Sequence, residues 1–128
     1  MAKIDHLKNT PGFSPRDTVY IDLILDLGQE LRYYTTDSLL ELSNEALQLS
    51  KDTNFQKGQS EAYLGIGDYY SDRGNRTAAI NNYTKGLILA KNIGNNRLTL
   101  RVLNSLATEY WYKGDFGRAL NNAFSSGW

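Results

Sequence analysis

An internal repeat of 40 residues constrains the fold of this chain more than any other feature. The segment EALQLSK (45–51) matches KGLILAK (85–91) at three positions. The segment GDYYSDRGNRTAAINN (67–82) matches ATEYWYKGDFGRALNN (107–122) at five positions, again with an offset of 40. A weaker copy, DLILDLGQELRYY (22–34), aligns best at an offset of 39. Repeats of this length are typical of chains in which one supersecondary unit stacks on the next.

Each repeat unit has the pattern of two helices. Apolar and small residues between Tyr63 and Tyr70 follow the i, i+3, i+4, i+7 spacing of one helical face. Gly74 and Asn75 come next, a glycine that can leave the helix with positive φ and then a good N-cap residue. The third unit repeats this order with Gly114-Asp115. We expect helices near residues 18–34, 37–53, 57–73, 76–93, 97–113 and 116–125.

Small residues recur at matching positions, where they let two antiparallel helices approach closely. They are Gly28, Gly67 and Ala107 in the first helix of each unit, and Ala79 and Ala119 in the second. Together with the turn at Gly114-Asp115, this pattern resembles the tetratricopeptide repeat, in a version longer than the usual unit of about 34 residues. HEAT and armadillo units also run near 40 residues, but the small positions and the turn favour the tetratricopeptide family.

The resemblance implies an all-α fold, an α-α superhelix of the right-handed solenoid type with about three helix-turn-helix repeats. The repeat domain would cover residues 17–128, after a flexible leader at residues 1–16. Its repeats would span about residues 18–54, 57–94 and 97–126, the last one truncated. The first repeat departs from the family pattern at Leu39, where alanine is expected, and at Ser43, where an aromatic residue is expected.

Charge and composition exclude several classes of partner. Lysine plus arginine and aspartate plus glutamate each number 14, so the net charge is zero, which argues against a broad nucleic-acid or anionic-lipid surface. No apolar run approaches the roughly 20 residues of a membrane helix. The chain has no cysteine and a single histidine, His6, so a zinc site is not expected. We expect no nucleic acid, membrane, metal or cofactor to bind this segment.

Two short motifs suggest chemistry but are better explained by helix packing. Asp115-Phe116-Gly117 has the letters of the magnesium-binding triplet of protein kinases, yet the other kinase motifs are absent. Asp115 instead takes the helix-capping position that Asn75 has one repeat earlier. Gly65-Ile66-Gly67 resembles part of a phosphate loop but lies inside a helical stripe and lacks a third glycine. Because no base, nucleophile and oxyanion donor converge, we expect no enzyme.

The resemblance also implies where a partner would bind. In tetratricopeptide superhelices the first helices of the repeats line a concave groove. Asp22 and Asp26 share a face of the first helix here, and an acidic pair of this kind on an exposed helix is usually only solvated. Members of the family that bind chaperones clamp a peptide carboxylate with lysines and asparagines, whereas the middle positions here are acidic, so that ligand is not expected. Trp111 and Tyr112 have a second interpretation, packing on the next repeat or on the leader. The groove residues carried over are Arg32, Tyr33, Glu61, Leu64, Asp68, Asp72, Arg101, Asn104, Thr108, Trp111 and Tyr112.

The last segment of the chain carries an apolar stripe with no polar capping helix after it. Repeat arrays need polar caps for solubility, so either more repeats follow or this face pairs with another chain. If no further repeat follows, we expect a homodimer through the truncated repeat. The residues of this self-association face are Phe116, Leu120 and Phe124.

The first repeat also resembles the opening of large bacterial signalling proteins. These place tetratricopeptide arrays ahead of a membrane helix and a histidine kinase, or of a DNA-binding output domain. The resemblance lies in Asp17-Thr18, in Glu30-Leu31-Arg32 and in Asp37-Ser38. It implies a sensory or scaffolding module that binds a protein or peptide, in the periplasmic part of a membrane-anchored sensor or otherwise in the cytoplasm. The alternative is a regulator that changes conformation when a small signalling peptide enters the groove.

Overall fold

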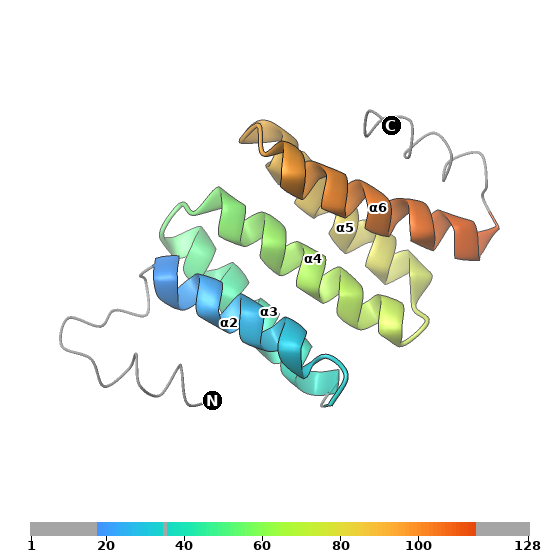
Figure 1. Ribbon diagram of the computed structural model, residues 1–128, viewed down its shortest axis with the longest axis horizontal. Helices are drawn as coiled ribbons and strands as arrows, with labels where there is room; N and C mark the ends of the chain where they lie inside the picture. Colours follow the sequence, from blue (N-terminus) through green and yellow to red (C-terminus); the bar gives the residue numbers. More distant parts are fainter. Residues whose placement is uncertain (1–17, 35, 115–128) are drawn as a thin grey trace.

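The computed structural model describes residues 18–34 and 36–114, and in these residues the chain forms five packed α-helices (Figure 1). The prediction of an all-α domain of sequential antiparallel helices is therefore confirmed. The predicted leader at 1–16, the helix at 116–125 and the residues Phe116, Leu120 and Phe124 lie outside the described residues. The helices are α2 (Thr18–Leu31), α3 (Thr36–Asp52), α4 (Gln56–Asp72), α5 (Arg76–Asn92) and α6 (Asn96–Lys113).

The helices form two layers. Figure 1 shows α2, α4 and α6 side by side in front, with α3 and α5 behind them. Each helix packs against the next along the chain, and α4 also contacts α2 and α6. Helix α4 is thus the central element, with all four other helices as neighbours.

Residues with left-handed backbone end four of the helices at a constant interval. Asn54, Gly74, Gly94 and Gly114 have φ of 55°, 77°, 67° and 89°, and they stand 20 residues apart. Such residues are typical at the C-terminal end of a helix, where glycine or asparagine meets little steric cost.

An asparagine follows Gly74 and Gly94, and each asparagine caps the next helix. The Asn75 side chain accepts a hydrogen bond from the backbone N–H of Ala78 at 3.2 Å, and Asn95 accepts one from Leu98 at 3.1 Å. The predicted turn at Gly74-Asn75 is confirmed, and the matching role of Asp115 lies outside the described residues. Such a cap stabilises a helix by about 1 kcal/mol.

Helices α3 and α5 bury the same positions, which confirms the 40-residue repeat as a repeat of packing. The buried positions of α3 recur in α5 with an offset of 40. The spacing i, i+4, i+7, i+11 keeps all four on one face of each helix. The two sets are Leu39, Ser43, Ala46 and Ser50 in α3, and Ala79, Tyr83, Gly86 and Ala90 in α5.

Two glycines of α4 receive its neighbours in the rear layer. A Cβ at Gly65 would lie 2.3 Å from the Ser43 hydroxyl, and one at Gly67 would lie 2.5 Å from the Tyr83 ring. Each glycine weakens the helix by about 1 kcal/mol relative to alanine, and close helix packing offsets this cost. Gly65-Ile66-Gly67 is therefore a packing site inside a helix, as predicted.

Candidate partner-binding groove

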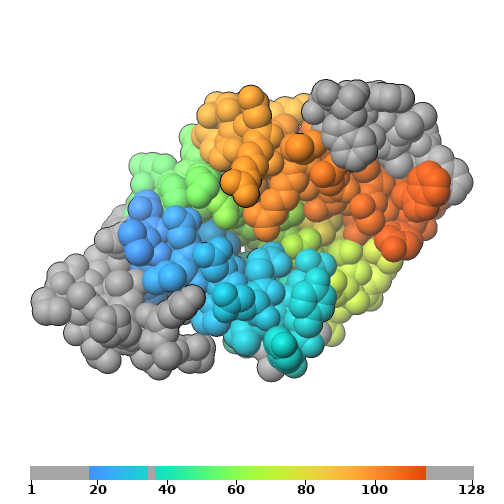
Figure 2. Space-filling model, viewed as in Figure 1, coloured from blue at the N-terminus to red at the C-terminus, as the bar shows by residue number. Residues whose placement is uncertain are grey.

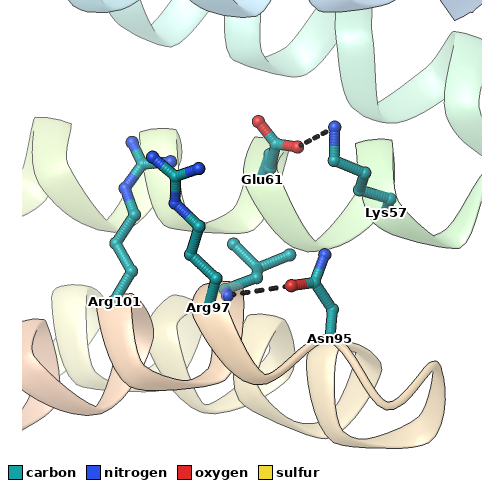
Figure 3. Close-up of a pocket in the computed structure, with 6 residues that line it drawn as sticks. Lys57, Glu61, Asn95, Arg97 and Arg101 are labelled. Carbon is teal, nitrogen blue, oxygen red and sulfur yellow. Dashed lines mark hydrogen bonds and ion pairs between the residues drawn. The ribbon is translucent and has the colours of Figure 1, made fainter.

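A cleft of about 320 Å³ lies between the N-terminal halves of α4 and α6. It opens on the front layer, the face on which the sequence resemblance places partner binding, and Figure 2 shows that face with the atoms of α4 between those of α2 and α6. Its volume falls at the lower end of the range of known ligand pockets, about 300–1,000 Å³. The lining residues, drawn in Figure 3, are Lys57, Glu61, Asn95, Arg97, Leu98 and Arg101.

The two arginines of the cleft make no polar contact with the described part of the chain. In Figure 3, Arg97 and Arg101 extend from α6 toward α4, and their i, i+4 spacing keeps them on one face of the helix. Both are exposed, and within residues 18–34 and 36–114 neither guanidinium group makes a hydrogen bond or an ion pair. On α4, Lys57 pairs with Glu61 at 3.2 Å. The cleft therefore carries a net positive charge.

The groove continues across α4 to the acidic side of α2. A hollow of about 30 Å³ has residues from both outer helices in its lining, with Asp26 from α2 and Arg101 from α6. Burial raises the pKa of Asp22, and the negative charge of Asp26 adds to this, while the Lys57 ammonium group opposes it. The nearby Glu61 carboxylate is the main cause that raises the pKa of Lys57. Asp26 thus lines the groove from α2, with Asp22 one helical turn away, and Arg97 and Arg101 line it from α6.

A polar network closes the same face between the C-terminal halves of α2 and α4. Arg32 donates two hydrogen bonds of 2.7 Å to the carboxylate of Asp72, and its guanidinium group lies 3.4 Å from Asp68. Asp68 also accepts hydrogen bonds from the Gln29 amide at 2.9 Å and from the Tyr83 hydroxyl at 2.6 Å. The Asp72 carboxylate is the main cause that raises the pKa of Arg32.

Two of the predicted groove residues do not face the groove as expected. Leu64 was expected to be exposed, but its exposed fraction is 2%, and it packs in a cluster with Ala79 and Tyr83. Asp68 is 7% exposed, because its carboxylate is surrounded by the side chains to which it bonds. A helix with neighbours on two sides buries two stripes, and both residues lie on the second one.

The other predicted residues fall into separate places on the front layer. Glu61 and Arg101 line the cleft, while Arg32 and Asp72 belong to the closed network. Tyr33 lies beyond the end of α2, and 83% of it is exposed. Whether any of these residues binds a partner stays a prediction. Those exposed on α6 are Asn104, Thr108, Trp111 and Tyr112.

Sequence reasoning missed a buried carboxylate between α4, α5 and α6. Glu109 is 1% exposed, and it pairs with Arg76 at 2.8 Å and accepts a hydrogen bond from Ser71. The guanidinium group of Arg76 also stacks 4.6 Å from the centre of the Tyr112 ring. A signal was present, because Glu109 continues the apolar spacing of the buried stripe. The preceding members of that stripe are Leu98, Val102 and Leu106.

Comparison with protein-family models, with curated proteins and with solved structures finds no match for this chain. Among residues 18–34 and 36–114, no group of three or more histidine, cysteine, aspartate or glutamate side chains is placed to hold a metal ion. None of the described helices is long and apolar enough to cross a membrane.

Proposed function

We propose that this chain is a non-catalytic helical-repeat module of the tetratricopeptide type, which binds a protein or peptide in the groove lined by α2, α4 and α6. We further propose that it is the sensory or scaffolding segment of a larger bacterial signal-transduction protein, either a histidine kinase or a transcriptional regulator.

The repeated architecture supports the first part of this proposal. The unit of 40 residues appears in the sequence and in the burial of α3 and α5. Small residues receive the neighbouring helices at Gly67 and Ala79, two positions that carry the family resemblance. The second part rests on the short resemblances in the first repeat alone.

The open cleft between α4 and α6 is the observation that carries the binding proposal. In the networks around Asp68 and Glu109, polar side chains of the front layer are paired with one another. In the cleft, Arg97 and Arg101 have no such partner among the described residues. Groups that the fold leaves unpaired are available to an outside ligand, and arginine is enriched among the residues that dominate protein interfaces.

A display library of random 12-residue peptides, selected on the full chain of 128 residues, tests the binding proposal. We expect binders in the micromolar range whose addition shifts the backbone amide NMR signals of residues 57–61 and 97–101. The variant Arg97→Ala/Arg101→Ala should weaken them at least tenfold and leave the far-ultraviolet circular dichroism unchanged.

The matched control removes two cations from another helix, with Lys85→Ala/Lys91→Ala on α5. We expect it to leave the affinity within about twofold, because both lysines are exposed and lie outside the lining of the cleft. A library that yields no binder, or binders that shift only signals outside α2, α4 and α6, would contradict the proposed function.

The parent protein is tested by the coding sequence around this segment. An adjoining histidine kinase or DNA-binding domain in the same reading frame would support the signalling assignment. An adjoining catalytic domain of another class would contradict it and leave the binding proposal intact.

A further inference from the structure

We infer that the groove is electrically bipolar and selects a peptide segment with separated charges, basic residues over α2 and acidic residues over α6. This inference rests on the proposed function, which it deepens by naming the chemistry of the partner. The partner is an extended internal segment of a protein, recognised through its side chains.

Opposite charges lie on the two sides of the groove, and neither set has an ion-pair partner within residues 18–34 and 36–114. On α2, Asp22 and Asp26 make no ion pair or hydrogen bond through their carboxylates within the described residues. On α6, the guanidinium groups of Arg97 and Arg101 also make no ion pair or hydrogen bond within the described residues. Groups of opposite sign that the fold leaves apart would each gain a partner from a ligand of complementary charge.

The ion pair on α4 adds little net charge between the two sides. Lys57 lies close enough to influence the pKa of Asp22, and it pairs with Glu61 at 3.2 Å. Lys57 and Glu61 therefore largely balance each other at the floor of the groove. The charge that remains is negative toward α2 and positive toward α6.

The spacing of the helices sets the length of the segment. Packed neighbouring helices lie about 8–10 Å apart, so α2 and α6, which flank α4, are separated by about 16–20 Å. An extended chain covers about 3.3 Å per residue. The distance from α2 to α6 is that between the helix axes, and the charged groups lie closer together, because Asp26 and Arg101 line one hollow across α4. A segment with its basic and acidic residues at most about five or six positions apart would therefore match both sides at once.

The test compares peptides with both termini blocked by acetylation and amidation, so that only side chains carry charge. One peptide has two lysines, four glycine or serine residues and then two glutamates. A second peptide has the same composition with lysine and glutamate alternating. We expect the first to bind the full chain at least tenfold more tightly in calorimetric titration at low salt, and to weaken as salt screens the charges.

The orientation is read with nitroxide labels. A label at the glutamate end should broaden the NMR signals of α6, and a label at the lysine end should broaden those of α2. The variants Arg97→Ala/Arg101→Ala and Asp22→Asn/Asp26→Asn should each remove the advantage of the first peptide, whereas Lys85→Ala/Lys91→Ala should keep it.

Equal affinity for the two peptides, broadening of the same helix by both labels, or binding only by a form with a free carboxyl terminus would overturn the inference. The library-selected peptides serve as the reference for the proposed function. If they bind the groove and show no separation of charges, the inference fails and the proposed function stands. If they do not bind the groove, the proposed function fails.

Discussion

The helix pairs α2–α3 and α4–α5 solve the same packing problem with opposite placements of large and small side chains. In α3, a large residue, Leu39, is followed four positions later by Ser43, whereas in α5 the small Ala79 is followed by Tyr83. All four are buried. Because cores tolerate exchanges that conserve total volume, one buried face admits both solutions.

The position of the buried hydroxyl decides what happens at the groove. Tyr83 fills the space over Gly67, and its hydroxyl holds Asp68 in the closed network. Ser43 is too short to do this at the matching place, and there it lines the hollow of about 30 Å³ below the groove, with Asp26 and Arg101. At matching positions of α5 and α3, a tyrosine thus belongs to the closed network and a serine lines a hollow.

Of the changes considered, alanine in place of the glycines of α4 should give the largest difference in the free energy of unfolding between the two sites, Gly65 and Gly67. We expect Gly67→Ala to lower the free energy of unfolding by about 2–3 kcal/mol, because the new methyl group meets the Tyr83 ring, which is held on all sides. Gly65→Ala should change it by less than about 1 kcal/mol, because the Ser43 hydroxyl can rotate away and alanine favours the helix. Urea denaturation measures both.

Equal losses in the two variants would contradict this difference between a ring and a hydroxyl. If Gly67→Ala does not fold, the double variant Tyr83→Leu/Gly67→Ala tests the same contact. In it the smaller leucine side chain makes room for the new methyl group, and we expect the protein to fold.

Removing one buried tyrosine hydroxyl from each helix pair, α2–α3 and α4–α5, should have an intermediate effect on the free energy of unfolding. Tyr83 donates to the buried Asp68 at 2.6 Å, and Tyr20 donates to the exposed Glu45 at 2.9 Å. We expect Tyr83→Phe to cost about 1–2 kcal/mol and Tyr20→Phe about 0.5–1 kcal/mol, since a charged acceptor that is buried loses more when its donor is removed. Thermal unfolding of the two variants measures these losses of stability. A larger loss for Tyr20→Phe than for Tyr83→Phe would contradict the expected order.

Alkaline titration should reveal an effect on stability about as small as that of Tyr20→Phe, through the ionisation of Tyr20. Burial, helped by the Glu45 carboxylate, raises the pKa of Tyr20 to about 12. The unfolded chain releases this proton near pH 10, so the stability that Tyr20 contributes is complete below pH 10 and is lost as the pH rises toward 12. Between pH 10 and 11 the wild type should lose about 1 kcal/mol relative to Tyr20→Phe. Parallel curves for the two proteins would show that Tyr20 ionises equally in both states.

The helices and their turns were predictable because their signals are local. Periodic apolar residues, and glycine followed by asparagine at Gly74-Asn75, act within a few residues of chain. The predicted helix at 18–34 was too long, since α2 ends at Leu31 and the N–H of Tyr34 then bonds to the Leu31 carbonyl in a turn. Boundaries of this kind depend on how the next helix begins.

The groove was predictable only in part, because burial there depends on neighbours. Glu61 and Arg101 were placed on the right face, but the cationic partner positions Lys57 and Arg97 were missed. Assigning one buried stripe to α4 put Leu64 and Asp68 outside it, although a central helix buries more than one. No local pattern predicted that Arg97 and Arg101 lack ion-pair partners among the described residues, because this depends on where the carboxylates of α2 lie in the fold.

The contacts of α4 with all four other helices have a consequence for motion. Amide hydrogens of α4 should exchange with solvent only on global unfolding. Helices α2 and α6, which contact fewer of the described helices than α4 does, should open locally at lower free energy. Helices α2 and α6, the walls of the groove, would then open locally while α4, its floor, stays folded. A partner that contacts both α2 and α6 would suppress this local opening. Slower exchange of the amide hydrogens of these two helices would therefore report that the partner has bound.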